Sequence, residues 1–428
     1  MFRQIAAAFA VLVSSAHLHA QTLAESATSV PAAKVTWAAA EISLTAKTKD
    51  APAAVIAADG ACAESEPCAC CPPPGQWWVR GEYLQWWLQG AHLPPLVTAS
   101  PPGTPIASAG ILGAPGTTIL FGDNDVNNDS RPGGRWQIGT WLDCDHTCGI
   151  QGSFFILGSQ STGTTIGSNG SQILARPFIN AGTGRPDAEL LSFPGVLAGS
   201  AAVDAGSSNL MGADLLFRKN LCCSSCDRLD FLAGYRFLRY DDHVNIREDL
   251  QPSGPLFVPG TRVGVEDSFS AHNQFHGAAL GLSYQRFHGP WSFEAEARID
   301  LGATIRDVTI DGNTAVSVPG APPVLDRGGL LALSSNIGTH HSTRFAVVPE
   351  LDLHVGYELT SHVRLLAGYS FLDWTRLNRA GEQIDLNVNR NLLPPVTPPV
   401  AGPARPAFPN ASSDMWIQGL SVGLEVRF

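Results

Sequence analysis

The stretch that decides the fold is Trp291–Arg306, WSFEAEARIDLGATIR, in which apolar and polar residues alternate without a break. Side chains of an extended strand point alternately to its two faces, so this pattern predicts one apolar face and one charged face. The stretch is also longer than the five or six residues of an ordinary globular strand. It is therefore typical of a long strand with two unlike faces.

Nine further segments carry strand-like patterns. Connections rich in Gly, Pro, Ser and Asn separate these segments. The ten predicted strands are 78–88, 134–143, 149–158, 209–219, 228–242, 272–286, 291–306, 344–358, 363–375 and 415–428. Their connections alternate between short ones of 4 to 8 residues and long ones of 29 to 50 residues. In an antiparallel meander this alternation places all short turns at one end, as in outer-membrane barrels with short periplasmic turns and long extracellular loops. We predict an all-β fold, an antiparallel up-and-down transmembrane β-barrel of about ten strands, or twelve if the 50-residue connection holds a hairpin.

The polarity of the two faces supports a membrane barrel. The charged face would be costly to bury in a dry core, whereas lipid outside and a wet lumen inside suit both faces. No run of 18 apolar residues follows the first twenty, which excludes a helical membrane anchor there. A net charge of −11 argues against nucleic-acid binding. A soluble secreted β-protein stays open as the alternative.

The N-terminal part differs from the rest in composition. Residues 1–20 are predicted to be a secretory signal, with Arg3 before the apolar run Ile5–Val13 and small Ala20 at its end. Residues 21–76 are rich in Ala and Pro and are predicted to be a periplasmic linker. The linker carries Cys62, Cys68, Cys70 and Cys71. The barrel is predicted to cover 77–428.

Three blocks resemble a known family. They are Gly81–Trp87 (GEYLQWW), Gly133–Asp143 (GGRWQIGTWLD) with Phe154–Leu157, and a tail block from Arg379–Asp385 (RAGEQID) to Gly423–Phe428 (GLEVRF). Together they are similar to the type-seven β-barrel porin family known chiefly from planctomycete bacteria. The resemblance covers Trp77 to Phe428 and implies a bacterial outer-membrane barrel, without substrate or catalytic residues to transfer. The terminal Phe428 looks like the C-terminal signal read by the barrel assembly machinery.

The charged faces of three consecutive strands supply the candidate pore-lining residues. These are Glu294, Glu296, Arg298, Asp300, Arg306, Glu350, Asp352, His354, Glu358 and Arg364. Carboxylates exceed arginines in this set, so an open pore would favour cations. A paired ionic plug is the alternative, because barrels of about eight strands are filled by side chains. The first hypothesis is therefore passive diffusion of small hydrophilic solutes, and the second is a structural or surface-interaction barrel with an occluded lumen.

The cysteines after the linker all fall in predicted short turns. They are Cys144, Cys148, Cys222, Cys223 and Cys226. Export to an oxidising compartment favours disulfides, with Cys144 and Cys148 as the simplest pair. With nine cysteines in the chain, at least one stays unpaired or bonds a second chain.

Signals for other chemistry are weak. The acidic stretch Asp123–Asp129 lacks the glycine and late glutamate of a calcium loop, and His340-His341 lacks a third ligand. No nucleophile-elbow, phosphate-loop or dinucleotide motif occurs. We therefore predict no cofactor, no metal and no enzymatic activity. The expected partners are outer-membrane lipid, the assembly machinery, small solutes and, as a further expectation, copies of the same chain.

Overall fold

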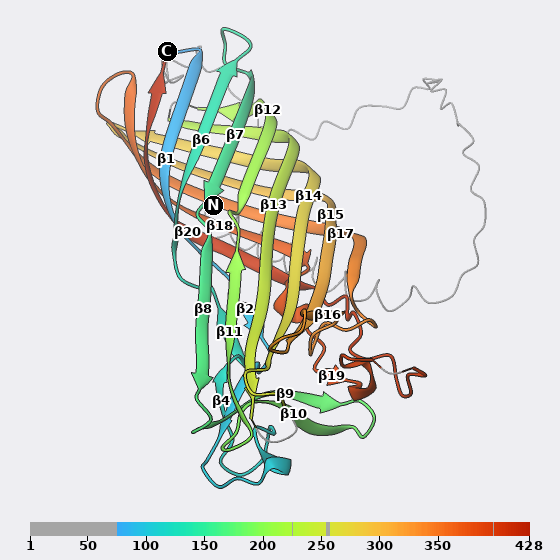
Figure 1. Ribbon diagram of the computed structural model, residues 1–428. Coiled ribbons are helices and arrows are strands. Elements are labelled where there is room, and N and C mark those ends of the chain that lie inside the picture. Colours follow the sequence, from blue (N-terminus) through green and yellow to red (C-terminus); the bar gives the residue numbers. More distant parts are fainter. Residues whose placement is uncertain (1–74, 225, 254–256, 397) are drawn as a thin grey trace, which may run out of the picture. The chain divides into compact units, whose positions relative to one another are not determined.

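Ten antiparallel strands form a closed ring in the computed structural model, which describes residues 75–428 except 225, 254–256 and 397 (Figure 1). The ring strands are β1 (Trp77–Leu88), β6 (Arg131–Trp141), β7 (Cys148–Leu157), β12 (Met211–Cys223), β13 (Asp227–Pro252), β14 (Arg262–His288), β15 (Trp291–Ser317), β17 (Gly338–Glu358), β18 (Val363–Leu377) and β20 (Ser413–Arg427). Each ring strand pairs with the next along the chain, and β20 pairs with β1 to close the barrel. The predicted up-and-down barrel and its ten strands are confirmed.

Short and long connections lie at opposite ends of this ring. The connections through residues 142–147, 289–290 and 359–362, and the one between Cys223 and Asp227, lie at one end, here called the turn end. At the turn end Phe428 exchanges backbone hydrogen bonds with Trp77, its N–H donating at 2.9 Å and its carbonyl accepting at 3.2 Å. The remaining connections leave from the opposite end, here called the loop end. In the described part of the chain, no helix is long and apolar enough to cross a membrane.

Three ring strands continue well past the barrel at the loop end. The region 243–271, which the sequence predicts to be a long loop, is mostly strand, because β13 and β14 stay paired from Asp227 and Arg286 out to Leu250 and Val263. Two strands from the predicted 50-residue loop, β8 (Gln160–Ser168) and β11 (Leu197–Ser207), join this extension through β13. They add two strands to the sheet outside the ring. The ring itself therefore keeps ten strands.

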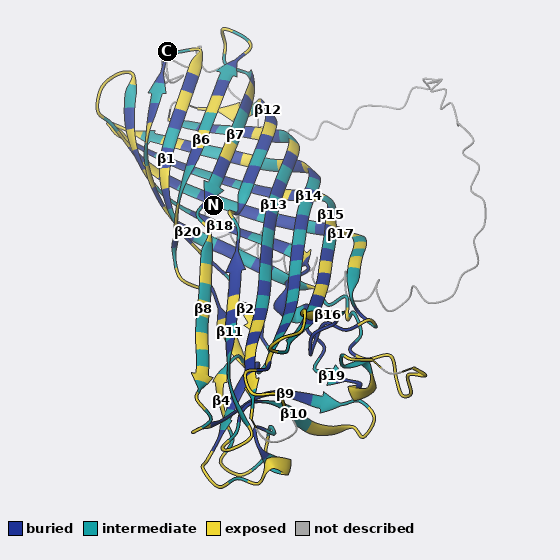
Figure 2. Cartoon of the chain, in the orientation of Figure 1, coloured by how far each residue is buried: buried dark blue, intermediate teal, exposed yellow. Residues whose placement is uncertain are grey.

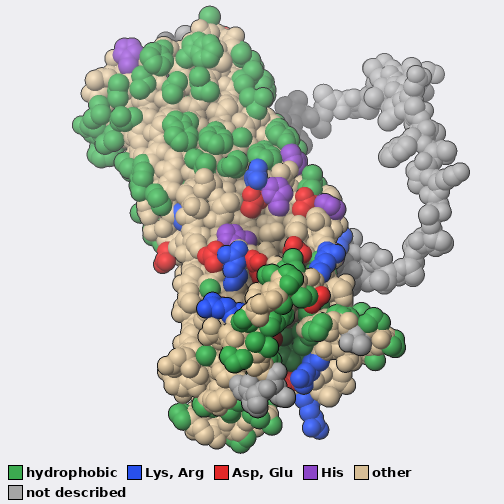
Figure 3. Space-filling view, in the orientation of Figure 1, with side chains coloured by type: hydrophobic (Ala, Val, Ile, Leu, Met, Phe, Trp, Pro, Cys, Tyr) green, Lys and Arg blue, Asp and Glu red, His purple; other side chains and the backbone are tan. Residues whose placement is uncertain are grey.

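Along these long strands, the outward face changes from apolar to polar toward the loop end. On β13 the outward side chains are apolar from Leu229 to Phe237 and polar from Arg239 onward. On β15 the outward face changes between Ile305 and Asp307, and on β17 between Phe345 and Thr343. Figure 2 shows the matching alternation of buried and exposed residues, and Figure 3 shows hydrophobic side chains over the barrel wall and charged ones toward the extension. This change of polarity marks the edge of the lipid-facing band at the loop end.

The long connections fold into a second layer of structure, here called the outer domain. Its strands are β2 (Ala91–Leu93), β3 (Val97–Ser100), β4 (Thr118–Phe121), β5 (Asn124–Val126), β9 (Ile173–Asn180), β10 (Arg185–Ser192), β16 (Val324–Arg327) and β19 (Asn387–Val388), with 3₁₀ turns η1 (Ile106–Ser108), η2 (Gly381–Gln383) and η3 (Arg390–Leu392). Leu93, Phe178 and Leu331 pack there against Ile246 and Phe269 on the inner face of the extended strands. Burial of this apolar surface stabilises the domain.

The tryptophans divide between the two sides of the barrel wall. Trp77, Trp136 and Trp291 lie on the outer surface, where an interfacial girdle would place them. The sequence pattern also suggests girdle positions for four tryptophans that the structure buries inside: Trp78, Trp86, Trp141 and Trp374. Their strand parity is that of the inner face, and parity rather than position near a strand end decides which side a residue takes.

The turn end holds the five described cysteines. No disulfide joins Cys144, Cys148, Cys222 or Cys226 in this structure, Cys223 ends β12, and the Cys144–Cys148 disulfide stays a prediction. The Asp143 carboxylate accepts the backbone N–H groups of Thr147 and Cys148 at 2.8 and 3.0 Å, which closes the turn without a covalent link. The Cys148 thiol lies 3.2 Å from Lys219 Nζ on β12. The linker cysteines, the predicted signal and most of the linker lie outside the described residues.

Candidate functional site: the barrel lumen

The inner face of the barrel carries the charged residues that the sequence predicts for it. Glu294, Glu296, Arg298 and Asp300 on β15, Glu350, Asp352 and His354 on β17 and Arg364 on β18 are all buried inside the ring. Glu358 is half-buried at the turn end, where Arg427 Nη1 donates to it at 3.2 Å. Arg306 is buried too, but it lies at the loop end and contacts none of the other candidates. The structure thus brings nine of the ten together and separates one.

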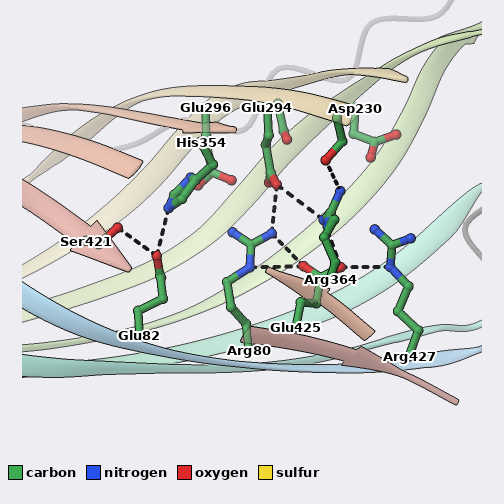
Figure 4. Close-up of polar contacts among 12 residues, drawn as sticks. Arg80, Glu82, Asp230, Glu294, Glu296, His354, Arg364, Ser421, Glu425 and Arg427 are labelled. Atoms are coloured by element: carbon green, nitrogen blue, oxygen red, sulfur yellow. Dashed lines mark hydrogen bonds and ion pairs between the residues drawn. The ribbon is translucent and has the colours of Figure 1, made fainter. Parts of the chain in front are cut away.

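Arg80 of β1 joins two carboxylates near the turn end of the lumen (Figure 4). Its Nη2 lies 2.7 Å from both Glu294 Oε2 and Glu425 Oε2. Arg364 Nη2 donates to the other Glu425 oxygen at 2.8 Å, and Arg427 Nε donates to that same oxygen at 2.7 Å. Side chains from β1, β15, β18 and β20 therefore meet across the lumen in one hydrogen-bonded group.

A second group surrounds Glu82. Arg135 Nε donates to Glu82 Oε2 at 2.6 Å, and Arg135 Nη1 lies 2.7 Å from Asp352 Oδ1. The Ser421 hydroxyl donates to Glu82 Oε1 at 2.9 Å, and His354 Nε2 lies at the same distance from that oxygen (Figure 4). This group links β1, β6, β17 and β20.

A third group forms on the opposite wall around two arginines. Arg236 Nη1 and Arg298 Nη1 lie 2.7 and 3.1 Å from Asp214 Oδ2. Both arginines also reach Glu350 Oε2, at 2.9 Å from Arg236 Nη2 and 2.5 Å from Arg298 Nη2. A buried charge is tolerated when it is paired and hydrogen-bonded, and these three groups meet that condition.

Many members of this network escape the sequence prediction. Those missed are Arg80, Glu82, Arg135, Asp214, Arg218, Arg228, Asp230, Arg236, Glu425 and Arg427. They share the inner-face parity of their strands, which is the signal that could have found them. The pattern hides them because the same face of β1 and β13 also carries large apolar residues such as Leu84, Trp86 and Leu238. With the added arginines, carboxylates and guanidinium groups become nearly equal in number, so the predicted excess of negative charge disappears.

Two further features close the lumen. The cavities lined by the ionic groups have volumes of only about 20 and 30 Å³, room for one or two water molecules each. Toward the loop end, a layer of apolar side chains here called the apolar layer crosses the barrel. It consists of Leu84, Trp86, Leu88, Phe155, Leu157, Leu210, Leu238, Tyr240, Phe275, Ala346, Val348, Leu372, Trp374, Leu377, Met415 and Ile417. Every member is at most 2% exposed, so the side chains of this layer are packed against one another.

The two weak metal candidates have structural explanations. Within Asp123–Asp129, residues Asn124–Val126 form β5 against β2, and Asn127 Nδ2 donates to the Ala205 carbonyl at 2.9 Å. His340 and His341 are neighbours in β17 and point to opposite faces. His340 stacks on Phe408 with ring centroids 4.0 Å apart, and His341 Nδ1 lies 2.6 Å from Asp307 Oδ1. Among the described residues, no three His, Cys, Asp or Glu side chains are grouped to hold a metal ion.

Comparison with solved structures returns bacterial outer-membrane proteins. The outer membrane protease OmpT of Escherichia coli is 12% identical, with 83% of this chain and 98% of that chain covered and a TM-score of 0.43. The toluene transporter TodX of Pseudomonas putida is 9% identical, with 83% and 90% covered and a TM-score of 0.21. A FadL homologue of Pseudomonas aeruginosa is 9% identical, with 82% and 89% covered and a TM-score of 0.20.

Comparison at the level of sequence gives a family. No curated protein matches this chain. The model of the family described as "Putative beta barrel porin-7 (BBP7)" matches residues 78–428, the whole barrel with its outer domain. This range agrees with the region over which the sequence motifs resemble that family. The chain therefore belongs to the beta barrel porin-7 family of bacterial outer-membrane barrels.

Proposed function

We propose that this outer-membrane barrel is a closed anchor that holds its outer domain at the cell surface. The observation that carries the proposal is the apolar layer, which crosses the lumen with contributions from β1, β7, β13, β14, β17, β18 and β20. An ion or a sugar that crossed this layer would lose its hydration without gaining a polar partner. The barrel then serves as a rigid, lipid-embedded base.

The ionic groups, which lie on the turn-end side of the apolar layer, support the same function. Arg80, Arg135, Arg236 and Arg298 each contact two carboxylates from other strands. Removing one partner of such a pair leaves an uncompensated buried charge, which is strongly destabilising. The ion pairs therefore hold the wall strands together across the lumen and engage the carboxylates of Glu82, Asp214, Glu294, Glu350, Asp352 and Glu425.

The outer domain is the part that faces the surroundings in this proposal. Its sheet and core are built from the long connections, which are extracellular in barrels of this kind. Their continuity with β13, β14 and β15 fixes the domain to the barrel wall. The proposal assigns surface interaction to this domain and no catalytic role to the barrel.

Swelling of proteoliposomes in small sugars tests the closed state. We expect vesicles that contain the wild-type barrel to swell no faster than empty vesicles. A variant with Trp86→Ala, Phe155→Ala and Trp374→Ala opens space in the apolar layer and provides the comparison. Heat-dependent migration on denaturing gels checks that both barrels are folded.

Rapid swelling with the wild-type protein would contradict the closed anchor. It would support the other hypothesis, passive diffusion of small hydrophilic solutes. Swelling that occurs only with the triple variant would identify the apolar layer as the barrier.

A further inference from the structure

Arg306 is a buried cation that has no carboxylate beside it. Its side chain is 1% exposed and lies just beneath the surface at the loop end of β15. Each of its three nitrogens contacts a neutral oxygen: Nε contacts Ser342 Oγ at 3.2 Å, Nη1 the Arg376 carbonyl at 3.4 Å and Nη2 Asn410 Oδ1 at 3.4 Å. These contacts are long, and they contrast with the charged partners of the lumen arginines.

Two further arginines surround this group. Arg344 on β17 is paired with Thr304, two residues before Arg306 on β15, and Arg376 on β18 accepts from Arg306 Nη1 through its carbonyl; both of these arginine side chains are exposed. None of the three forms an ion pair with a carboxylate in the described ranges. Like charges repel one another. An anion that binds between the three arginines therefore lowers their electrostatic free energy.

The cluster lies where two wall strands separate. The ladder between β17 and β18 begins at Glu350 and Leu372, and closer to the loop end the Thr375 hydroxyl bonds both the N–H and the carbonyl of Val347, each at 2.9 Å. Beyond that point, β17 pairs only with β15. Arg344 and Arg376 therefore stand on the two sides of a seam where β17 and β18 are not paired, with Asn410 of the β18–β20 connection beside Arg306. Arg306 and Arg344 have the inner-face parity of their strands, so a group outside the wall would reach them through this seam.

The depth of the cluster matches the surface of the lipid bilayer. Arg306 stands between Ile305, the last apolar residue of the outward face of β15, and Asp307, the first polar one. Arg344 has the corresponding place on β17, between Phe345, 61% exposed, and Thr343. Lipid headgroups lie at this level, where the apolar band ends.

We propose that Arg306, Arg344 and Arg376 bind the phosphate group of an anionic lipid in the leaflet at the loop end. Guanidinium groups present planar forks of donors that match phosphate oxygens, and these three form no ion pair with a carboxylate among the described residues. A soluble phosphate shares this chemistry, but the level of the cluster favours the lipid. The inference does not require the lumen to be closed.

Native mass spectrometry of the full-length barrel in detergent tests the site. The probes are phosphatidylglycerol and phosphatidylcholine with the same acyl chains, titrated separately, and inorganic phosphate as a competitor. The wild-type barrel should retain phosphatidylglycerol more tightly than phosphatidylcholine. The double variant R344Q/R376Q should lose about tenfold or more of its affinity for phosphatidylglycerol, because it loses charge-assisted hydrogen bonds.

The matched control is R239Q/R247Q, which removes the same net charge. Arg239 and Arg247 lie on the outward face of β13 and pair with Asp241 at 3.0 Å and Glu266 at 2.9 Å. The control should keep the wild-type preference. Equal losses in the two double variants, or no loss in R344Q/R376Q, would overturn the proposal. Displacement of the lipid by millimolar inorganic phosphate would instead assign the cluster to a soluble ligand and overturn the lipid assignment.

Discussion

Glu189 of the outer domain is a carboxylic acid held close to other carboxylates. Its Oε2 oxygen is buried without a hydrogen-bond partner. The nearby Arg176 contacts Glu248 and lies 2.8 Å from Asp267 Oδ2, so its charge is already shared by two carboxylates. Burial, followed by repulsion from Glu248, raises the pKa of Glu189 well above its ordinary value. The folded domain therefore holds a proton on Glu189 more tightly than the unfolded chain does.

Glu189→Gln should stabilise the outer domain at neutral pH by about 1–3 kcal/mol, because the neutral amide removes a charge that burial and the Glu248 carboxylate oppose. Because the folded pKa is raised, the stability that Glu189 contributes is complete below its unfolded pKa of about 4 and is lost as the pH rises through the folded value. Hydrogen exchange of residues 185–192, corrected for intrinsic rates, should show protection that falls with rising pH in the wild type and stays flatter in Glu189→Gln. The exposed Asp311→Asn is the control, and an equal change in that variant would refute a specific role for Glu189.

Among the elements, β15 shows what an alternating residue pattern predicts correctly and what it does not. Odd-numbered residues are apolar from Trp291 to Ile305, whereas the large apolar residues after that point, Val308, Ile310 and Val316, are even-numbered. The change of parity ends the predicted strand at Arg306, although β15 continues to Ser317. Strand geometry does not change there. The surroundings do, because lipid gives way to water outside and the ionic lumen gives way to the core of the outer domain inside.

An arginine scan along the outward face of β15 tests this boundary. Ile299→Arg lies near the middle of the apolar stretch and should destabilise the folded barrel by about 2–4 kcal/mol, as a cation does at the bilayer midplane. Thr309→Arg points to the same side of the same strand beyond the boundary and should cost little. Denaturant unfolding in lipid vesicles measures both free energies. Equal costs at the two positions would show that the apolar band does not end at Ile305.

For the whole molecule, the sequence predicts the barrel better than its contents. The ten ring strands and the segregation of short and long connections follow from period-two patterns and turn residues, which are local signals. The pairing of Arg80 with Glu294 and Glu425, the burial of Trp86 and Trp374, and the Arg306 cluster depend on residues from strands distant in the chain. No local pattern encodes which side chains meet across a lumen, so the sequence leaves the choice between a pore and a plug open.

Single-channel recording in planar lipid bilayers tests the central claim most directly, namely that the apolar layer and the paired ionic groups close the lumen. The wild-type protein, shown to be folded by its heat-dependent gel migration, is inserted repeatedly and recorded in potassium chloride. The closed barrel predicts no stable conductance steps over many insertions. Reproducible steps with cation selectivity that falls when Glu294, Glu296 and Asp300 are neutralised together would contradict the closed lumen and establish an open, cation-preferring pore.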